Sequence, residues 1–114
     1  MKDELYHFDL YQDAAESTAV YPDKGHNLYY PTLGLAGETG EVCEKIKKIM
    51  RDNEGELTQE HKEDLVKELG DVLWYIATLA TELNVSFASI AEANLEKLQD
   101  RMDRGVIKGS GDNR

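Results

Sequence analysis

The amino-acid sequence predicts an all-α fold: a single, four-helix bundle-like domain that is oligomeric and ends in a flexible C-terminal arm. Four long segments repeat apolar residues at intervals of three and four, and turn-forming residues separate these segments. At 114 residues the chain is long enough for one domain with a modest core. Because that core is small, association between copies would help to stabilise it.

The limits of the first two helices follow from turns and helix-end signals. The first expected helix covers about residues 5–19, and turn-rich residues 21–27 follow it. The second covers about residues 33–50, with Pro31 near its first turn, and it ends close to residues 53–55, where Asn and Gly suit a helix end.

Two cap residues mark the third and fourth helices. Thr58 is a candidate N-cap for a helix that continues to about residue 83, and Ser86 is the cap for a helix over residues 87–103. Trp74 lies opposite the apolar stripe of the third helix, which indicates a second buried surface. We expect that surface to be a subunit interface.

The C-terminal tail differs in composition from the rest of the chain. Residues 105–114 contain too many glycines for a helix and form either a disordered end or an arm that closes over another part of the molecule. We therefore divide the chain into a helical domain, residues 1–104, and a Gly-rich tail, residues 105–114.

Two acidic pairs with the same spacing lie on the second and third expected helices. Glu38 and Glu41 are three positions apart, and so are Glu68 and Asp71. Residues with this spacing lie on one side of a helix, with Cβ atoms about 5–6 Å apart. If the two helices pack antiparallel through their apolar stripes, the pairs face each other and can share cations. The alternative is that these are ordinary solvated carboxylates.

Three small residues on these helices also need an explanation. Gly40 and Gly70 occupy matching positions, and a glycine inside a helix costs about 1 kcal/mol relative to alanine. We expect a backbone or a ligand to approach them closely. The single cysteine, Cys43, excludes an internal disulfide, and we expect it to be a small apolar filler of its helix.

The composition limits the partners of the protein. A formal net charge of −10 argues against nucleic acid, because phosphate backbones are bound by clustered Lys and Arg. It does not argue against polyphosphate, since carboxylates that hold Mg²⁺ become locally attractive to phosphate. We find no apolar run long enough for a membrane span and no signal peptide, and we expect a cytoplasmic protein.

Candidate substrate contacts lie outside the acidic pairs. Asn94, Lys97 and Arg101 flank the apolar stripe of the fourth helix, where they either pair with surface acids or bind phosphate. His26, Tyr29 and Tyr30 lie in or after the turn-rich segment. They either pack that segment against the helices or contact a nucleobase.

The combination of these residues resembles the MazG-like nucleoside triphosphate pyrophosphohydrolases, an all-α group that includes helical dUTPases and dCTP pyrophosphatases. The acidic pairs are similar to the ExxE…ExxD metal motif of that family, and the fourth helix carries a similar Asn-x-x-Lys-x-x-x-Arg. The tail resembles the short, single-domain phage and bacterial branch. Many members have a glutamate doublet where this chain has Gly37 and Glu38, which affects the expected number of metal ions.

The resemblance implies Mg²⁺-dependent hydrolysis of a (deoxy)nucleoside triphosphate to the monophosphate and pyrophosphate, by a homodimer or homotetramer. Mn²⁺ is a possible substitute for Mg²⁺. The expected metal ligands are Glu38, Glu41, Glu68 and Asp71; the expected catalytic residues are Glu41 as general base, Glu38, Lys97 and Arg101; the expected substrate contacts are Asn94, Lys97, Arg101, His26, Tyr29 and Tyr30.

Two other functions remain open from the sequence. The first is hydrolysis of another diphosphate compound, such as a nucleotide alarmone or phosphoribosyl-ATP. The second is a non-catalytic helical interaction protein, in which the acids keep a dimer in solution. Only the enzymes require ligand binding that depends on Mg²⁺.

Overall fold

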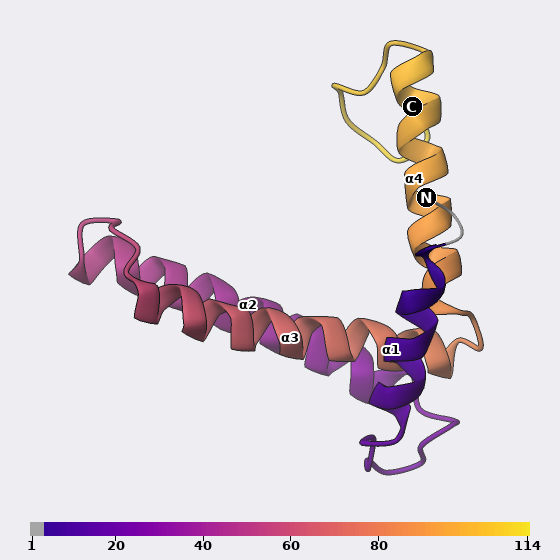
Figure 1. Ribbon diagram of the computed structural model, residues 1–114, viewed down its shortest axis with the longest axis horizontal. Coiled ribbons are helices and arrows are strands. Elements are labelled where there is room, and N and C mark those ends of the chain that lie inside the picture. The colour runs from indigo at the N-terminus through magenta and orange to yellow at the C-terminus, as the bar shows by residue number, and fades with distance from the viewer. Residues whose placement is uncertain (1–3) are drawn as a thin grey trace.

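Four α-helices and their connections form the computed structural model, which describes residues 4–114 and contains no strand in that range. The helices are α1 (Tyr6–Glu16), α2 (Tyr29–Asp52), α3 (Gln59–Glu82) and α4 (Phe87–Asp103) (Figure 1). The all-α class is therefore confirmed, as is the order of four helices. None of the helices in the described range is long and apolar enough to cross a membrane.

Both predicted N-caps are confirmed. The Thr58 side chain accepts a hydrogen bond from the His61 backbone N–H at 3.1 Å, and the His61 ring accepts one from the Thr58 N–H at 3.1 Å. Ser86 Oγ accepts from the Ser89 N–H at 3.0 Å. These bonds satisfy backbone donors that the first turn of a helix leaves free.

Helix α2 begins at Tyr29, earlier than the apolar pattern indicates. Asn27 Oδ1 accepts hydrogen bonds from the N–H groups of Tyr29 and Tyr30, both at 3.1 Å. The Asn27 side chain therefore caps the N-terminus of α2. Pro31 lies in the first turn and is buried, as its fixed φ and missing N–H allow.

Helices α2 and α3 form a long antiparallel pair and make the most extensive contact between helices (Figure 1). Helix α1 crosses the C-terminal part of α3 and covers a small apolar core there. That core contains Ala15, Ala77 and Phe87, with Phe8, Tyr11, Trp74 and Ile76 packed against it.

Trp74 has its partner within the same chain. Its indole N–H donates to Thr18 Oγ1 at 2.9 Å, just beyond α1, and its ring packs against the core. The second buried surface that Trp74 indicated is therefore the surface under α1. The expectation of a subunit interface at this residue stays a prediction, since Trp74 is only partly buried within one chain.

Two polar residues of α1 fix the point at which α4 begins. Gln12 donates to Thr81 Oγ1 at 3.1 Å and to Val85 O at 3.0 Å, and it accepts from the Phe87 N–H at 2.9 Å. Asp9 Oδ1 accepts from the Ala88 N–H at 2.9 Å, where a negative charge also suits the N-terminus of a helix.

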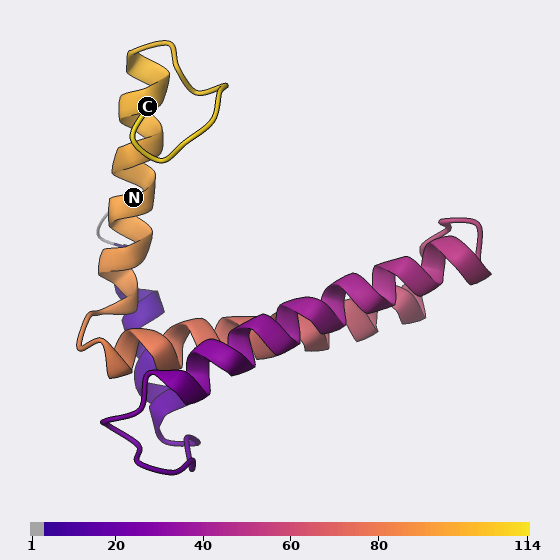
Figure 2. The same cartoon turned by 180° about the vertical axis from the view of Figure 1, so that it is seen from behind.

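From this point α4 extends away from the α2–α3 pair at a steep angle, so the four helices do not close into a bundle within one chain (Figures 1 and 2). The radius of gyration is 16.9 Å, compared with roughly 13–14 Å for a compact domain of this length. Large apolar side chains remain exposed on α2, α3 and α4, including Leu33, Met50, Val66, Leu69 and Met102.

The tail contains no helix, as expected, and folds back beside the C-terminal half of α4 (Figure 2). The Arg114 side chain donates to the carbonyl oxygens of Val106, Ile107 and Gly111 at 2.6–3.1 Å. Arg104 donates to the carbonyl of Arg114 at 2.5 Å. These contacts make residues 105–114 a closed loop on the side of α4.

Candidate metal centre

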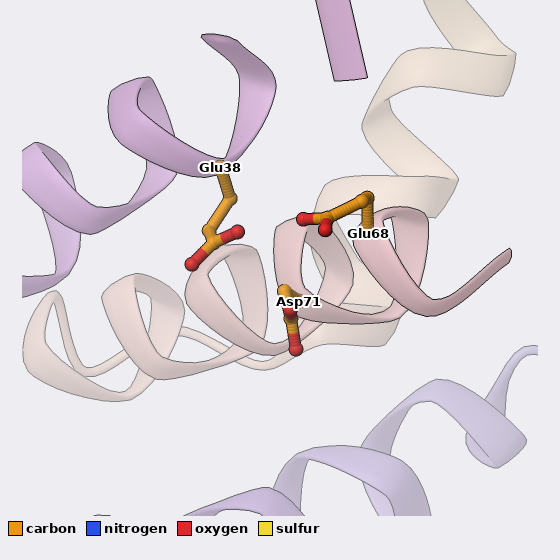
Figure 3. Close-up of side chains that lie close together, drawn as sticks. All are labelled: Glu38, Glu68 and Asp71. Atoms are coloured by element: carbon orange, nitrogen blue, oxygen red, sulfur yellow. The ribbon is translucent and has the colours of Figure 1, made fainter. Parts of the chain in front are cut away.

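Three carboxylates converge where α2 and α3 lie side by side. Glu38 comes from α2, and Glu68 and Asp71 come from α3 (Figure 3). One carboxylate oxygen from each lies within 4.8 Å of the others. The antiparallel packing thus brings residues thirty positions apart in the chain to one place, and we call this group the acid cluster.

The acid cluster raises the pKa of Glu38. Burial is the main cause; the negative charge of Asp71, a hydrogen bond with Glu68, and the charges of Glu68 and Glu41 add to it. Three acidic neighbours therefore contribute negative charge around the partly buried Glu38. A divalent cation would relieve that repulsion.

Glu41 is placed differently from the other three acids. It is exposed, as Asp71 also is, but it is not one of the three acids whose oxygens approach each other within 4.8 Å. Its charge nevertheless contributes to the raised pKa of Glu38. Glu41 therefore lies at the rim of the acid cluster, where water can reach it.

Lys45 lies against the acid cluster and was not singled out from the sequence. Its Nζ is 3.8 Å from Glu68 Oε1, and the two side chains are 35% and 19% exposed. Lys45 follows Glu41 by one helical turn, so helical spacing would have placed it on this side of α2. One cation of the protein thus lies beside the acid cluster, next to Glu68.

An aromatic group borders the other side of the acid cluster. Tyr75 follows Asp71 by one turn of α3, and its pKa is raised by burial, by its neighbour Tyr30, and by the charges of Glu38 and Asp71. The ring of Tyr30 stacks on that of Tyr21, with centroids 4.7 Å apart and planes 4° apart. Tyr75 was also missed in the sequence, although its spacing from Asp71 would have placed it here.

The predicted base contacts differ in position. Tyr30 reaches the neighbourhood of the acid cluster through Tyr75, with the two ring centroids 6.4 Å apart. Tyr29 is 81% exposed, and His26 is exposed in the loop between α1 and α2. Of the three, only Tyr30 is connected to the acid cluster within one chain.

Within residues 4–114, the glycines on α2 and α3 do not have the close backbone contact that was one of their two expected explanations, and the approach of a ligand stays a prediction. Within the described residues, and apart from the neighbouring backbone of the same helix, no atom lies within 4 Å of the position that a Cβ would take at Gly40 or Gly70. The close approach occurs at Gly34 instead, where the ring of Tyr75 crosses α2. Cys43 is likewise exposed and is not a buried filler.

The chain does not bring the predicted phosphate contacts to the acid cluster. Asn94, Lys97 and Arg101 lie on α4, and the cations lie in the half of this helix that extends away from α2 and α3 (Figure 2). Lys97 and Arg101 both contact Asp112 of the tail. Within one chain, the acids and the cations form separate groups.

The donor atoms of the acid cluster suit a hard divalent cation. All three residues offer carboxylate oxygens, with no sulfur or imidazole ligand among them. Mg²⁺ and Mn²⁺ prefer such oxygens. Glu38, Glu68 and Asp71 are thus the side chains that would hold the ion, with Glu41 one turn away on α2.

Fold and site together define an all-helical protein whose candidate metal centre is built from carboxylates on two antiparallel helices. The MazG nucleotide pyrophosphohydrolase domain matches residues 29–106, a range that includes both acidic pairs and the cations of α4, and the chain belongs to this family. The description of this domain is nucleotide pyrophosphohydrolase, and a site of carboxylates that can hold a metal ion fits that chemistry.

Two relatives extend the comparison. The gene 37 protein of Mycobacterium phage L5 is 54% identical over 113 residues, which cover 95% of this chain and 99% of that protein. The uncharacterized protein YvdC of Bacillus subtilis (strain 168) is 33% identical over 91 residues, which cover 73% of this chain and 86% of that protein. No solved structure matches the chain.

Proposed function

We propose that the protein hydrolyses (deoxy)nucleoside triphosphates to the monophosphate and pyrophosphate with Mg²⁺, for which Mn²⁺ can substitute, in house-cleaning or in control of the nucleotide pool. The convergence of Glu38, Glu68 and Asp71 is the observation that carries this proposal. Membership of the MazG nucleotide pyrophosphohydrolase family supports it independently.

The residues of the acid cluster and its rim have different roles in the proposed reaction. Glu38, Glu68 and Asp71 hold the ion, which when bound supplies positive charge to the triphosphate and lowers the pKa of water. The carboxylate of Glu41, at the exposed rim, accepts a proton from the attacking water. The bond between the α- and β-phosphates is broken, and pyrophosphate leaves.

The aromatic residues provide a surface for the base. Tyr75 borders the acid cluster, and Tyr30 and Tyr21 continue the aromatic surface away from it. Flat rings of this kind stack on any nucleobase, so the arrangement favours a nucleotide over a simple diphosphate. It does not distinguish a nucleoside triphosphate from phosphoribosyl-ATP or a nucleotide alarmone, because these compounds also carry a nucleobase.

A second subunit completes the site in this proposal. The acids and the cations Lys97 and Arg101 are apart within one chain, and exposed apolar side chains line α2, α3 and α4. A homodimer or homotetramer would cover these surfaces and bring the cations of one subunit to the acids of another. We expect an oligomer by light scattering.

Mixed oligomers test this arrangement. The variants Asp71→Asn and Lys97→Met are each expected to be inactive alone. Mixing them before refolding should restore activity, because some sites then combine intact acids with intact cations. If the mixture stays inactive, the acids and the cations of one active site do not come from two different subunits, and the proposed arrangement is wrong.

The proposed activity is tested with a panel of dNTPs, NTPs and other pyrophosphate compounds, scored by pyrophosphate release with and without Mg²⁺. Glu38→Gln and Asp71→Asn should lower turnover at least about 100-fold, while the helical circular dichroism spectrum stays near wild type. Glu63→Gln, on an exposed part of α3 beside Gln59, is the control for removing one charge.

The panel also separates the alternatives. If pyrophosphate is released only from an alarmone or from phosphoribosyl-ATP, the proposed substrate is wrong but the proposed metal centre stands. If both acid variants keep full Mg²⁺-dependent turnover, the assignment of the acid cluster is wrong. If nothing in the panel is cleaved or bound with Mg²⁺, the chain is an interaction protein.

A further inference from the structure

The two cations of α4 share one partner atom. Lys97 Nζ lies 3.0 Å from Asp112 Oδ1, and Arg101 Nη2 lies 3.1 Å from the same oxygen. Arg101 Nη2 also donates to the Asp112 carbonyl oxygen at 2.8 Å. Asp112 Oδ1 therefore occupies a position at which one oxygen contacts both cations.

The burial of the three side chains is unequal. The Arg101 side chain is 7% exposed, whereas the Asp112 side chain is 80% exposed and that of Lys97 is 40% exposed. The cations thus belong to the body of α4, and the carboxylate reaches them from outside. Lys97 and Arg101 also lower the pKa of Asp112, so this carboxylate is ionised at neutral pH.

The tail holds the carboxylate in place by its own contacts. Arg114 and Arg104 close residues 105–114 into a loop on α4 through hydrogen bonds to backbone carbonyls. Asp112 is close to the end of that loop. It can leave the cations if this part of the loop opens, without any change in α4.

Carboxylate and phosphate oxygens are equivalent partners for Lys and Arg in charge and in hydrogen bonding. We propose that Asp112 Oδ1 marks the position of a phosphate oxygen, and that the tail must release Asp112 before a triphosphate is bound by both Lys97 and Arg101. The inference rests on the proposed function for its ligand, the triphosphate of a nucleotide.

Displacement is energetically reasonable. The Lys97 and Asp112 side chains are both exposed, and an exposed ion pair adds little stability because water competes for both charges. A triphosphate brings several negative charges to the same two cations and meets one negative charge of the tail. Asp112 consequently weakens triphosphate binding and excludes anions that carry too little charge to displace it.

The experiment uses sodium tripolyphosphate in EDTA at low ionic strength, so that neither metal binding nor turnover contributes. A ¹H–¹⁵N NMR titration measures affinity and location together. Asp112→Asn should bind tripolyphosphate about three- to tenfold more tightly than wild type. Asp103→Asn is the control, since it removes one charge from the same region, at a residue that contacts Gln99 instead.

The same titration reports on the tail. In wild type, tripolyphosphate should shift the resonances of Gly109 and Gly111 toward those of a flexible chain. In Lys97→Met/Asp112→Asn the gain in affinity should be lost. The inference is overturned if Asp112→Asn binds no more tightly than Asp103→Asn, or if no variant binds tripolyphosphate. Wild-type turnover of Mg²⁺-nucleotides would survive either result, so the proposed function would stand.

Discussion

The ring of Tyr75 lies over the backbone of Gly34. A Cβ at residue 34 would fall 2.1 Å from Cε1 and 2.4 Å from Cζ of that ring, much closer than two carbon atoms approach without a shift. Gly34 precedes Glu38 by one turn of α2, and Tyr75 follows Asp71 by one turn of α3. The missing side chain therefore admits an aromatic ring beside the acid cluster.

Gly34→Ala should displace the Tyr75 ring. Because the ring end of a side chain can swing aside, we expect a moderate loss of about 1–2 kcal/mol in the free energy of unfolding. The KM for nucleotide should rise, since the aromatic border of the acid cluster moves. Urea unfolding and steady-state kinetics measure the two effects.

Gly37→Ala is the matched control for this substitution. It lies on the same helix, and in the described residues no atom beyond the neighbouring backbone of α2 lies within 4 Å of the Cβ position. Alanine there should stabilise α2 by about 0.5–1 kcal/mol. If both variants gain stability equally, the Tyr75 ring does not occupy the space over Gly34.

Lys45 and a metal ion should compete for Glu68. The ammonium lies 3.8 Å from a carboxylate oxygen of the acid cluster, so a bound divalent ion meets a like charge nearby. At this distance two charges interact by about 1–4 kcal/mol, depending on the effective dielectric constant. Lys45→Met should therefore tighten Mg²⁺ binding about three- to tenfold in calorimetry.

Lys47→Met is the comparison for Lys45. It removes the same charge from the same helix, but its ammonium pairs with Glu44 at 2.9 Å instead of the acid cluster. Mg²⁺ affinity should change little. Equal tightening in both variants would mean that net charge, and not the contact with Glu68, controls the affinity.

Thr78 carries a buried hydroxyl without a hydrogen-bond partner in the structure. Thr78→Val removes that unmet polar group at nearly constant volume, so it should raise the free energy of unfolding by about 0.5–1 kcal/mol. Thr81→Val should lower it by about 1 kcal/mol, because Thr81 Oγ1 accepts from Gln12 and donates to Ala77 O. Opposite signs in urea unfolding are the expected result.

The features that sequence reasoning predicted are those that local physics determines. The caps Thr58 and Ser86 and the start near Pro31 depend on neighbouring backbone groups, so they can be predicted from short stretches. Glu38 and Glu68 lie close together because each has the same position relative to the apolar stripe of its helix. That inference needed only the helical period and antiparallel packing.

Other features depend on contacts distant in the chain. Gln12 and Asp9 fix the start of α4 through single hydrogen bonds, which no periodicity reveals, and so the separation of Lys97 from the acids could not be predicted. The partner of Trp74 depended on where α1 lies. The pairing of Lys97 with Asp112 required a tail of glycines and turns to fold back on α4.

Glu82 holds the loop that leads into α2. Its carboxylate accepts hydrogen bonds from the Tyr21 hydroxyl at 2.5 Å, the Gly25 N–H at 2.8 Å and the Asn27 N–H at 3.2 Å. Burial alone would raise the pKa of Glu82, but these hydrogen bonds lower it overall from its ordinary value of 4.5. The loop therefore depends on the ionised form.

Glu82→Gln should lower the free energy of unfolding by about 1–2 kcal/mol at neutral pH, because an amide replaces a charged acceptor of three bonds. Between the folded and unfolded pKa values, the folded wild-type protein binds fewer protons than the unfolded chain, so stability rises with pH there. The contribution of Glu82 is thus present above 4.5 and is lost as the pH falls through the lower, folded pKa.

The difference between wild type and Glu82→Gln should therefore shrink as the pH is lowered from about 7 to about 3, as measured by urea unfolding at each pH. Tyr21→Phe removes one of the three donors and should give a smaller loss at neutral pH. A gap between wild type and Glu82→Gln that stays constant over this range would mean that the carboxylate charge does not hold the loop. Since Asn27 caps α2, loosening this loop should also fray the turn that carries Tyr30.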